Sequence, residues 1–237
     1  LFGTEYEKVN AEFFTNIRGP FPYTSNVDKS RDTLGVFTKT NLLVDDYILA
    51  SGIRYDTIDG FGDKITGRLG VSKNGFRSSV SLGYRVPTLY EMYGKDNYGF
   101  TGNPDLKEED TLSFEIGYAN DFSDTAIFIT QETDAIVYTN TYVNDKSKSY
   151  TKGIENKLFF DVGGINVVNN LAIISAKKSN GDDKLRRPNI TNNTKFSKLV
   201  NNMLYSFDID YYGKHKDINS ATWQTISVDP VVTYNAE

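Results

Sequence analysis

Apolar and polar residues alternate with a period of two along most of the 237-residue chain. Between Leu112 and Tyr118 every second residue is apolar or aromatic, and the residues between them are Ser, Glu and Gly. Because successive side chains of a strand point to opposite faces, this period indicates strands with one apolar and one polar face. No window convincingly places apolar residues at the spacing of a helix. The pattern therefore predicts an all-β chain.

About twelve strands are predicted, and the central ones are close to the ~9–11 residues that a tilted strand needs to cross a bilayer. Pro230 falls inside the last of them and predicts an edge strand, a bulge or a misplaced boundary. The faces of 125–137 and 165–176 cannot be assigned because these segments alternate poorly. The predicted strands are 4–17, 31–43, 47–56, 64–72, 76–86, 110–119, 125–137, 150–160, 165–176, 192–199, 204–212 and 223–235.

The predicted connections alternate between long and short, which places all tight turns at one end of the sheet. Short turns fall at 44–46, 73–75, 120–124, 161–164 and 200–203, and longer connections at 18–30, 57–63, 87–109, 138–149, 177–191 and 213–222. Short periplasmic turns and long extracellular loops are typical of an outer-membrane β-barrel.

The two faces predict the same architecture. In a membrane barrel the apolar residues face lipid, so we expect Leu82, Tyr84, Phe114, Ile116 and Phe207 to point outward. Their polar neighbours would then line a wet interior. In a soluble sandwich the same alternation occurs with the apolar face as its core, so alternation alone does not separate the two folds.

Composition narrows the possible functions. The chain has no Cys, one His and a formal net charge of −5. The first two leave little room for a metal site or a catalytic triad, and the third argues against a nucleic-acid binder. The mean hydropathy is −0.45, and no apolar run is long enough for a transmembrane helix.

One segment carries a specific motif. Residues 84–94 read YRVPTLYEMYG, residues 102–109 read GNPDLKEE, and a strand with Glu115 and Gly117 follows. This segment strongly resembles the β-barrel of TonB-dependent outer-membrane receptors, and the layout is most similar to the cobalamin and siderophore branch. Shorter pieces at 49–56, 134–136, 152–155 and 186–188 also resemble the family. The resemblance covers essentially the whole chain.

The motif residues are expected to shape a long loop, and they are also candidates for contact with a ligand. Pro87 should end a strand ladder, and Arg85 should pair with Glu91, Glu109 or Glu115. The candidate site residues are Arg85, Pro87, Glu91, Tyr93, Gly94, Tyr98, Phe100, Gly102, Asn103, Pro104, Leu106 and Glu109.

The resemblance implies a receptor that closes about 22 strands around a plug. It implies uptake of a scarce large solute, a ferric siderophore or cobalamin, bound by the extracellular loops and released through an energising TonB-type partner. We therefore expect no catalytic residues, no nucleic-acid partner and a monomer in the outer membrane of a Gram-negative bacterium. Residues 1–237 would form a partial barrel domain without a plug, a C-terminal fragment of the receptor.

Several residues bear on the identity of the ligand without deciding it. Residues 88–102 contain no His, which argues against the haem receptors of the family. The loop aromatics Tyr90, Tyr93, Tyr98 and Phe100 either stack on a flat ligand or pack the loop. No cofactor is expected, because the acidic residues Asp96, Asp105, Glu108, Glu109 and Asp110 lack a recognisable Ca²⁺ spacing and no metal ligands are assigned. His215 is expected in a late loop, without a partner.

A basic cluster invites a separate hypothesis. These side chains would attract an anionic ferric siderophore or lipid phosphates, unless they are only the solvated charges of a loop. The cluster consists of Lys177, Lys178, Lys184, Arg186 and Arg187.

Two other architectures also remain open: a complete twelve-stranded outer-membrane pore, and a soluble carbohydrate-binding β protein.

Overall fold

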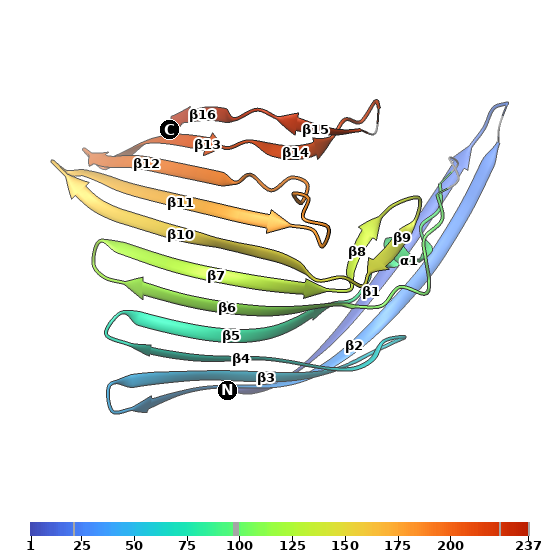
Figure 1. Cartoon of the computed structure of the whole chain (residues 1–237), viewed down its shortest axis with the longest axis horizontal. Coiled ribbons are helices and arrows are strands. Elements are labelled where there is room, and N and C mark those ends of the chain that lie inside the picture. Colours follow the sequence, from blue (N-terminus) through green and yellow to red (C-terminus); the bar gives the residue numbers. More distant parts are fainter. Residues whose placement is uncertain (21, 97–99, 223, 237) are drawn as a thin grey trace.

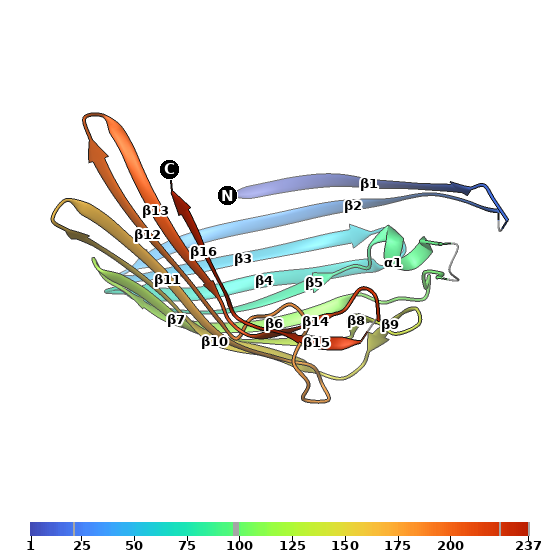
Figure 2. The same ribbon diagram turned by 90° about the horizontal axis from the view of Figure 1, so that it is seen from above.

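The computed structural model describes residues 1–20, 22–96, 100–222 and 224–236. Twelve strands form one curved antiparallel sheet, in which each strand pairs with its neighbours in chain order (Figures 1 and 2). They are β1 (Phe2–Ile17), β2 (Tyr23–Val44), β3 (Tyr47–Ile58), β4 (Gly62–Lys73), β5 (Phe76–Arg85), β6 (Glu109–Ala119), β7 (Ser123–Thr133), β10 (Ser149–Val162), β11 (Ile165–Lys177), β12 (Ile190–Val200), β13 (Met203–Tyr212) and β16 (Val231–Ala236).

Three smaller pieces lie in the long connections. The helix α1 (Leu89–Tyr93) follows β5, the hairpin of β8 (Ala135–Tyr138) and β9 (Tyr142–Asp145) follows β7, and the hairpin of β14 (His215–Ile218) and β15 (Thr225–Val228) follows β13. All three lie at the end of the sheet opposite the tight turns (Figure 1). The described helix is too short to cross a membrane.

The twelve-stranded antiparallel sheet confirms the predicted architecture, with three corrections. The connection expected at 18–30 is much shorter, because β2 begins at Tyr23 and pairs with β1 along its whole length. The segment 125–137 contains two strands, separated at Asp134, whose φ is 55°. The segment 223–235 also contains two, because Pro230 falls between β15 and β16 and cannot donate to a ladder.

The tight turns follow from residues that tolerate positive φ. Asn74–Gly75, Gly163–Gly164 and Asn201–Asn202 each place two successive residues in the left-handed region. That geometry matches the twist of the strands on either side of a two-residue turn, and Asn and Gly adopt it most readily. These turns fix the register of the hairpins that they close.

The two faces of the sheet differ as the alternation predicts. Residues directly opposite each other on paired strands share a face, so Ile116, Ile127, Ile154 and Ile173 form one continuous apolar row across four strands. Leu82, Phe114, Ile116 and Phe207 are 56, 44, 51 and 41 % exposed, and they lie on the outside rather than in a dry core.

Tyr84 departs from the expected outward set. Its hydroxyl donates a 3.0 Å hydrogen bond to Asp56, a buried residue on the polar face. The reason is positional: the ladder between β4 and β5 extends only from Lys73–Phe76 to Gly67–Leu82, so Tyr84 lies beyond its end. A strand end without a partner on one side is free to bend, and the side chain reaches the interior.

Aromatic side chains gather beside the tight turns on the apolar face. The rings of Phe76 and Tyr118 lie 4.5 Å apart between centroids, and Phe122 is 68 % exposed in the next turn. Tyr47 lies beside the turn between β2 and β3, and is also exposed. Aromatic girdles at the edge of the apolar band are typical of membrane barrels.

The sheet is a partial barrel, and no plug lies among the described residues. The buried apolar residues concentrate instead around the helix: Leu89, Met92, Phe100 and Leu106 are all at most 9 % exposed. Figure 2 shows α1 at the long-loop end of the curved sheet. The best-packed part of the chain is therefore the long-loop end.

Candidate functional site

The helix at the long-loop end is fixed by its first residues. Thr88 is the N-cap: its hydroxyl accepts a hydrogen bond from the Glu91 backbone N–H at 3.1 Å, and the Glu91 carboxylate accepts one from the Thr88 N–H at 2.6 Å. This reciprocal capping box starts α1 directly after Pro87, which is fully buried. The pattern Thr-x-x-Glu is the sequence signal for this helix, which the alternation did not reveal.

Arg85 ties the helix to the strand that follows it. Its guanidinium lies 3.0 Å from Glu91 and 2.7 Å from Glu109, which are two of the three partners expected for it. The third, Glu115, instead pairs with Arg77 at 3.2 Å. Burial would raise the pKa of Glu91, but hydrogen bonds from Arg85 and Thr88 outweigh it and hold that pKa below its ordinary value.

Glycines allow two backbones to meet behind the helix. The N–H of Gly102 donates to the Gly94 carbonyl at 2.8 Å. A Cβ on Gly102 would lie 2.6 Å from the carbonyl carbon of Met92, and a Cβ on Gly94 would lie 2.6 Å from the Tyr90 carbonyl oxygen. Their place in the motif predicts positions that tolerate positive φ, but neither residue has positive φ. Both positions require glycine for close packing instead.

The second half of the motif anchors the neighbouring hairpin. The side-chain amide of Asn103 donates to the Tyr142 carbonyl of β9 at 3.0 Å, and its oxygen accepts from the Asp105 N–H. Pro104 begins the turn that this bond closes, and Leu106 is 4 % exposed. This segment joins the loop before β6 to the β8–β9 hairpin.

The loop aromatics form a packed cluster. The Phe100 ring stacks on Tyr90 at 5.3 Å and contacts Tyr138 and Tyr142 at 6.0 and 5.8 Å. Tyr90 also meets Phe13 of β1 edge-on at 5.5 Å. Loop packing thus accounts for the buried Phe100, whereas the side chains of Tyr90 and Tyr138 remain 43 and 53 % exposed.

The remaining motif positions have separate environments. Tyr93 lies under the ammonium of Lys29, 5.1 Å from its ring centroid. Glu109 also accepts a hydrogen bond from the Ile136 backbone N–H. Tyr98 lies outside the described residues. With that exception, the structure brings the motif together into one hub, which links β1, β2, β5, β6 and the β8–β9 hairpin.

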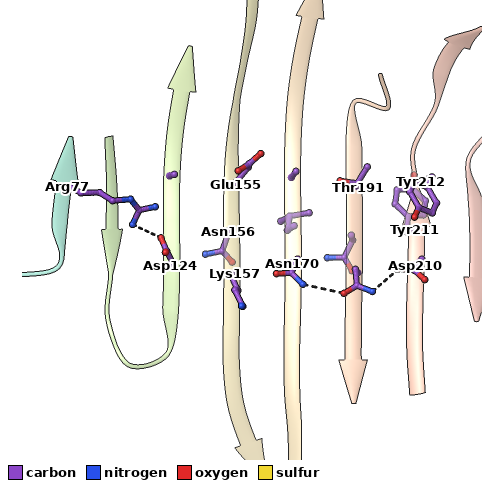
Figure 3. Close-up of a pocket in the computed structure, with 15 residues that line it drawn as sticks. Arg77, Asp124, Glu155, Asn156, Lys157, Asn170, Thr191, Asp210, Tyr211 and Tyr212 are labelled. Atoms are coloured by element: carbon purple, nitrogen blue, oxygen red, sulfur yellow. Dashed lines mark hydrogen bonds and ion pairs between the residues drawn. The ribbon is translucent and has the colours of Figure 1, made fainter. Parts of the chain in front are cut away.

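The polar face near the tight turns carries a second set of groups (Figure 3). Arg77 lies 2.6 Å from Asp124, and Asn170, Asn193 and Asp210 form a hydrogen-bonded chain across three strands, with distances of 3.2 and 2.7 Å. They line a recess of about 470 Å³. Of its lining, Ala126 of β7 and the β11 residues belong to the segments whose faces cannot be assigned from the sequence, whereas Asp124 falls in the predicted turn 120–124.

The other charged candidates are dispersed. Glu108 pairs with Lys64, and Lys184 with Glu132 at 2.6 Å. Arg186 lies 2.8 Å from Asp217. Two members of the expected basic cluster, Lys184 and Arg186, are therefore engaged by different acidic partners. Within the described part of the chain, no group of His or acidic side chains is arranged to hold a metal ion.

His215 begins β14, and its ring nitrogen Nδ1 is 3.2 Å from the Gly213 carbonyl oxygen. His215 thus lies in the expected long connection, and the correction is that this connection contains a hairpin.

A curved antiparallel sheet with an exposed apolar outer face, a polar hollow and its loops gathered at one end defines the wall of a membrane β-barrel. The chain matches the family model for the TonB dependent receptor-like β-barrel over residues 1–237, and it belongs to that family. The family consists of receptors and transporters rather than enzymes.

Named relatives agree with this assignment. The chain is 29 % identical over 100 residues to the vitamin B12 transporter BtuB of Vibrio vulnificus, a match that covers 40 % of this chain and 15 % of that protein. A second BtuB, from Photobacterium profundum, is 26 % identical over 98 residues, or 39 % of this chain and 16 % of its own. The matched region thus spans less than a fifth of either curated relative.

Solved structures share the fold over nearly the whole chain. The siderophore receptor PirA from Acinetobacter baumannii superposes with a TM-score of 0.70 and 16 % identity, over 98 % of this chain and 47 % of its own. A mutant of the ferric enterobactin receptor PfeA from Pseudomonas aeruginosa gives 0.73 and 18 %, over 98 % of this chain and 42 % of its own. At these identities the likeness concerns the fold alone.

Proposed function

We propose that this chain is part of the barrel of an outer-membrane receptor that takes up a scarce large solute, a ferric siderophore or cobalamin, with energy from a TonB-type partner. The observation that carries the proposal is the packed hub at the long-loop end, built on residues of the family motif. It holds several long connections in fixed positions above a polar hollow. Such a scaffold suits recognition of a ligand by loops.

The polar hollow supports the same proposal. Ion pairs such as Arg77–Asp124 and Arg54–Asp56 line it, so a water-filled or polar content is favoured there. In the complete receptor, which we propose to be monomeric, this wall would surround the plug through which the partner acts. Neither the pore nor the soluble carbohydrate-binding alternative accounts for the family motif.

Among the motif region's aromatics, we assign ligand contact to Tyr90 and Tyr138. Their rings are exposed while Phe100 behind them is buried, so a flat or ring-rich ligand would find two faces supported by a rigid base. Arg85, Glu91, Gly102 and Asn103 then act by holding the loop in place. The named relatives bind different solutes, and two candidate ligands follow from them.

The direct test is binding to the full-length protein that contains this chain. Titration calorimetry with cyanocobalamin and with a ferric catecholate siderophore should give saturable binding of one of them. Tyr138→Ala should weaken it roughly fivefold, and Phe122→Ala, which removes another exposed ring at the opposite end, should not. Binding of neither compound, together with a permanently open conductance in planar bilayers, would support a pore instead.

A further inference from the structure

The outer face of four neighbouring strands carries an apolar groove. It has a volume of about 560 Å³ and lies over β6, β7, β10 and β11. Its outward lining consists of Phe114, Ile116, Ile127, Ile129, Ile154 and Ile173. These side chains occupy opposite positions on paired strands, so they share the face that also carries Leu82 and the girdle aromatics.

A lysine stands among these apolar side chains. Lys152 lines the groove and lies directly opposite Ile129 on β7 and Ser175 on β11, so it shares the outward face. The side chain is exposed, and within the described residues it forms no ion pair. Tyr150, two residues nearer the long loops, is 41 % exposed and bonds Gln131.

The height of Lys152 places it near one border of the apolar band. Phe160, on the same face of β10 near the tight turns, is eight residues away, or about 26 Å of strand. A tilt of about 40° reduces this to about 20 Å along the membrane normal, against an apolar band of about 25 Å. Lys152 is therefore within reach of the headgroups on the long-loop side.

A basic recess adjoins the groove at this border. It has a volume of about 350 Å³, and Ile174 and Ser175 line both hollows. Its charged lining is Lys177, Asp183, Arg187, Lys214 and Lys216, with His215 beside them. Asp183 is engaged by Lys177 at 2.6 Å, and within the described part of the chain the other three cations form no ion pair. The recess thus keeps an excess of positive charge.

We propose that the groove and the recess together bind a membrane lipid whose phosphate-bearing headgroup is net anionic. An acyl chain occupies the apolar groove, and the phosphate lies between Lys152 and the basic recess. Charge complementarity and the continuity of the two hollows favour a lipid over a soluble anion, which would use the recess and leave the groove unexplained. The proposal needs the outward face to meet lipid, but it does not depend on which solute the receptor transports.

Native mass spectrometry of the full-length protein that contains this chain tests the proposal. The detergent-solubilised protein is offered phosphatidylglycerol and phosphatidylcholine with identical acyl chains. We expect preferential retention of phosphatidylglycerol, and Lys152→Gln should weaken it about fivefold, the effect of one cation near a lipid surface. Lys157→Gln, on the same strand but opposite Asp124 on the polar face, should leave retention unchanged.

A second variant tests the basic recess without changing any residue of β10. Lys214→Gln combined with Lys216→Gln lies in the long-loop region and should also reduce the preference for phosphatidylglycerol. Equal retention by the wild type, Lys152→Gln and the double variant would overturn the proposal. Displacement of phosphatidylglycerol by inorganic phosphate would also overturn it, since the recess would then be a site for soluble anions. Solute binding measured on the same samples would show separately whether the transport function holds.

Discussion

The hydroxyl of Tyr84 donates a 3.0 Å hydrogen bond to Asp56, whose carboxylate also accepts a 2.7 Å bond from Arg54. Asp56 is 1 % exposed, and Arg54 reaches on to Glu5 of β1. This contact joins three strands on the polar face at the point where the ladder between β4 and β5 has ended. It holds the long-loop ends of these strands together next to the motif hub.

Removal of the Tyr84 hydroxyl should therefore destabilise the protein. Tyr84→Phe takes one hydrogen bond from a buried carboxylate, and bonds to charged groups contribute about 1.5–3 kcal/mol. Urea unfolding in detergent or lipid should show a loss in this range. Tyr118→Phe is the matched control, because Tyr118 is exposed on the outer face and packs against Phe76 with its ring tilted by 48°, without using its hydroxyl in the described structure. An equal loss in both variants would contradict the assigned contact.

A charged side chain introduced at two neighbouring positions of β5 should reduce the stability of the folded protein by unequal amounts. Leu82→Arg places a cation on the outer face and should cost about 2–4 kcal/mol if that position lies at the bilayer midplane. Ser81→Arg points into the polar hollow and should cost much less, despite Arg68 directly opposite, because water screens the repulsion. Refolding titrations into lipid vesicles measure both, and equal tolerance would refute the register.

How far the sequence predicts this fold depends on where each residue lies. Most of the twelve strands follow from alternation, because lipid on one side and water on the other impose opposite demands on neighbouring residues. β7 and β11 are exceptions, since the segments that contain them alternate poorly and their faces cannot be assigned from the sequence. Alternation does not predict the start of β2, because that part of the strand has no apolar stripe. Apolar and polar residues do not alternate along Tyr23, Thr24, Ser25 and Asn26. Tyr84 was placed on the wrong face because alternation assumes a ladder on both sides.

The candidate site shows the same limit. The motif pointed to Arg85, Glu91 and Glu109, and the structure brings these three together. Which glutamate pairs with Arg85 depended on the path of the loop, since Glu115 is engaged by Arg77 on a neighbouring strand. The contacts of Asn103 with Tyr142 cross 39 residues, and no local pattern predicts them.

A methyl group at Gly102 should loosen the hub. Gly102→Ala places Cβ 2.6 Å from the Met92 carbonyl carbon, so the backbone must shift to relieve the contact. Overpacking of this kind destabilises a protein by about 1–3 kcal/mol. Limited proteolysis should then cut faster between Gly94 and Glu109. Gly52→Ala is the control, because its Cβ would have an ordinary 3.7 Å contact with the Thr38 carbonyl. Unchanged cleavage in Gly102→Ala would mean that the close approach is not needed.

The stabilising effect of Glu91 should depend on pH. Its pKa is held below the ordinary value in the folded protein, so its contribution to stability is present above the unfolded pKa of about 4.3 and is lost as the pH falls through the lower folded value. Glu91→Gln should therefore be less stable than the wild type at pH 7, and the difference should shrink below about pH 4. A difference that is constant from pH 7 to pH 3 would exclude ionisation of Glu91 as its cause.

The central claim is that alternate residues of each strand meet lipid and water. The described chain has no cysteine, so single cysteines at successive positions of β6, from Ser113 to Tyr118, can carry a nitroxide label in the full-length protein reconstituted in lipid. Electron paramagnetic resonance accessibility should alternate with a period of two, oxygen reaching labels at positions 114 and 116 and a water-soluble nickel chelate reaching those at 113 and 115. Similar accessibility at both sets, or protection of 114 and 116 from both reagents, would contradict a barrel wall.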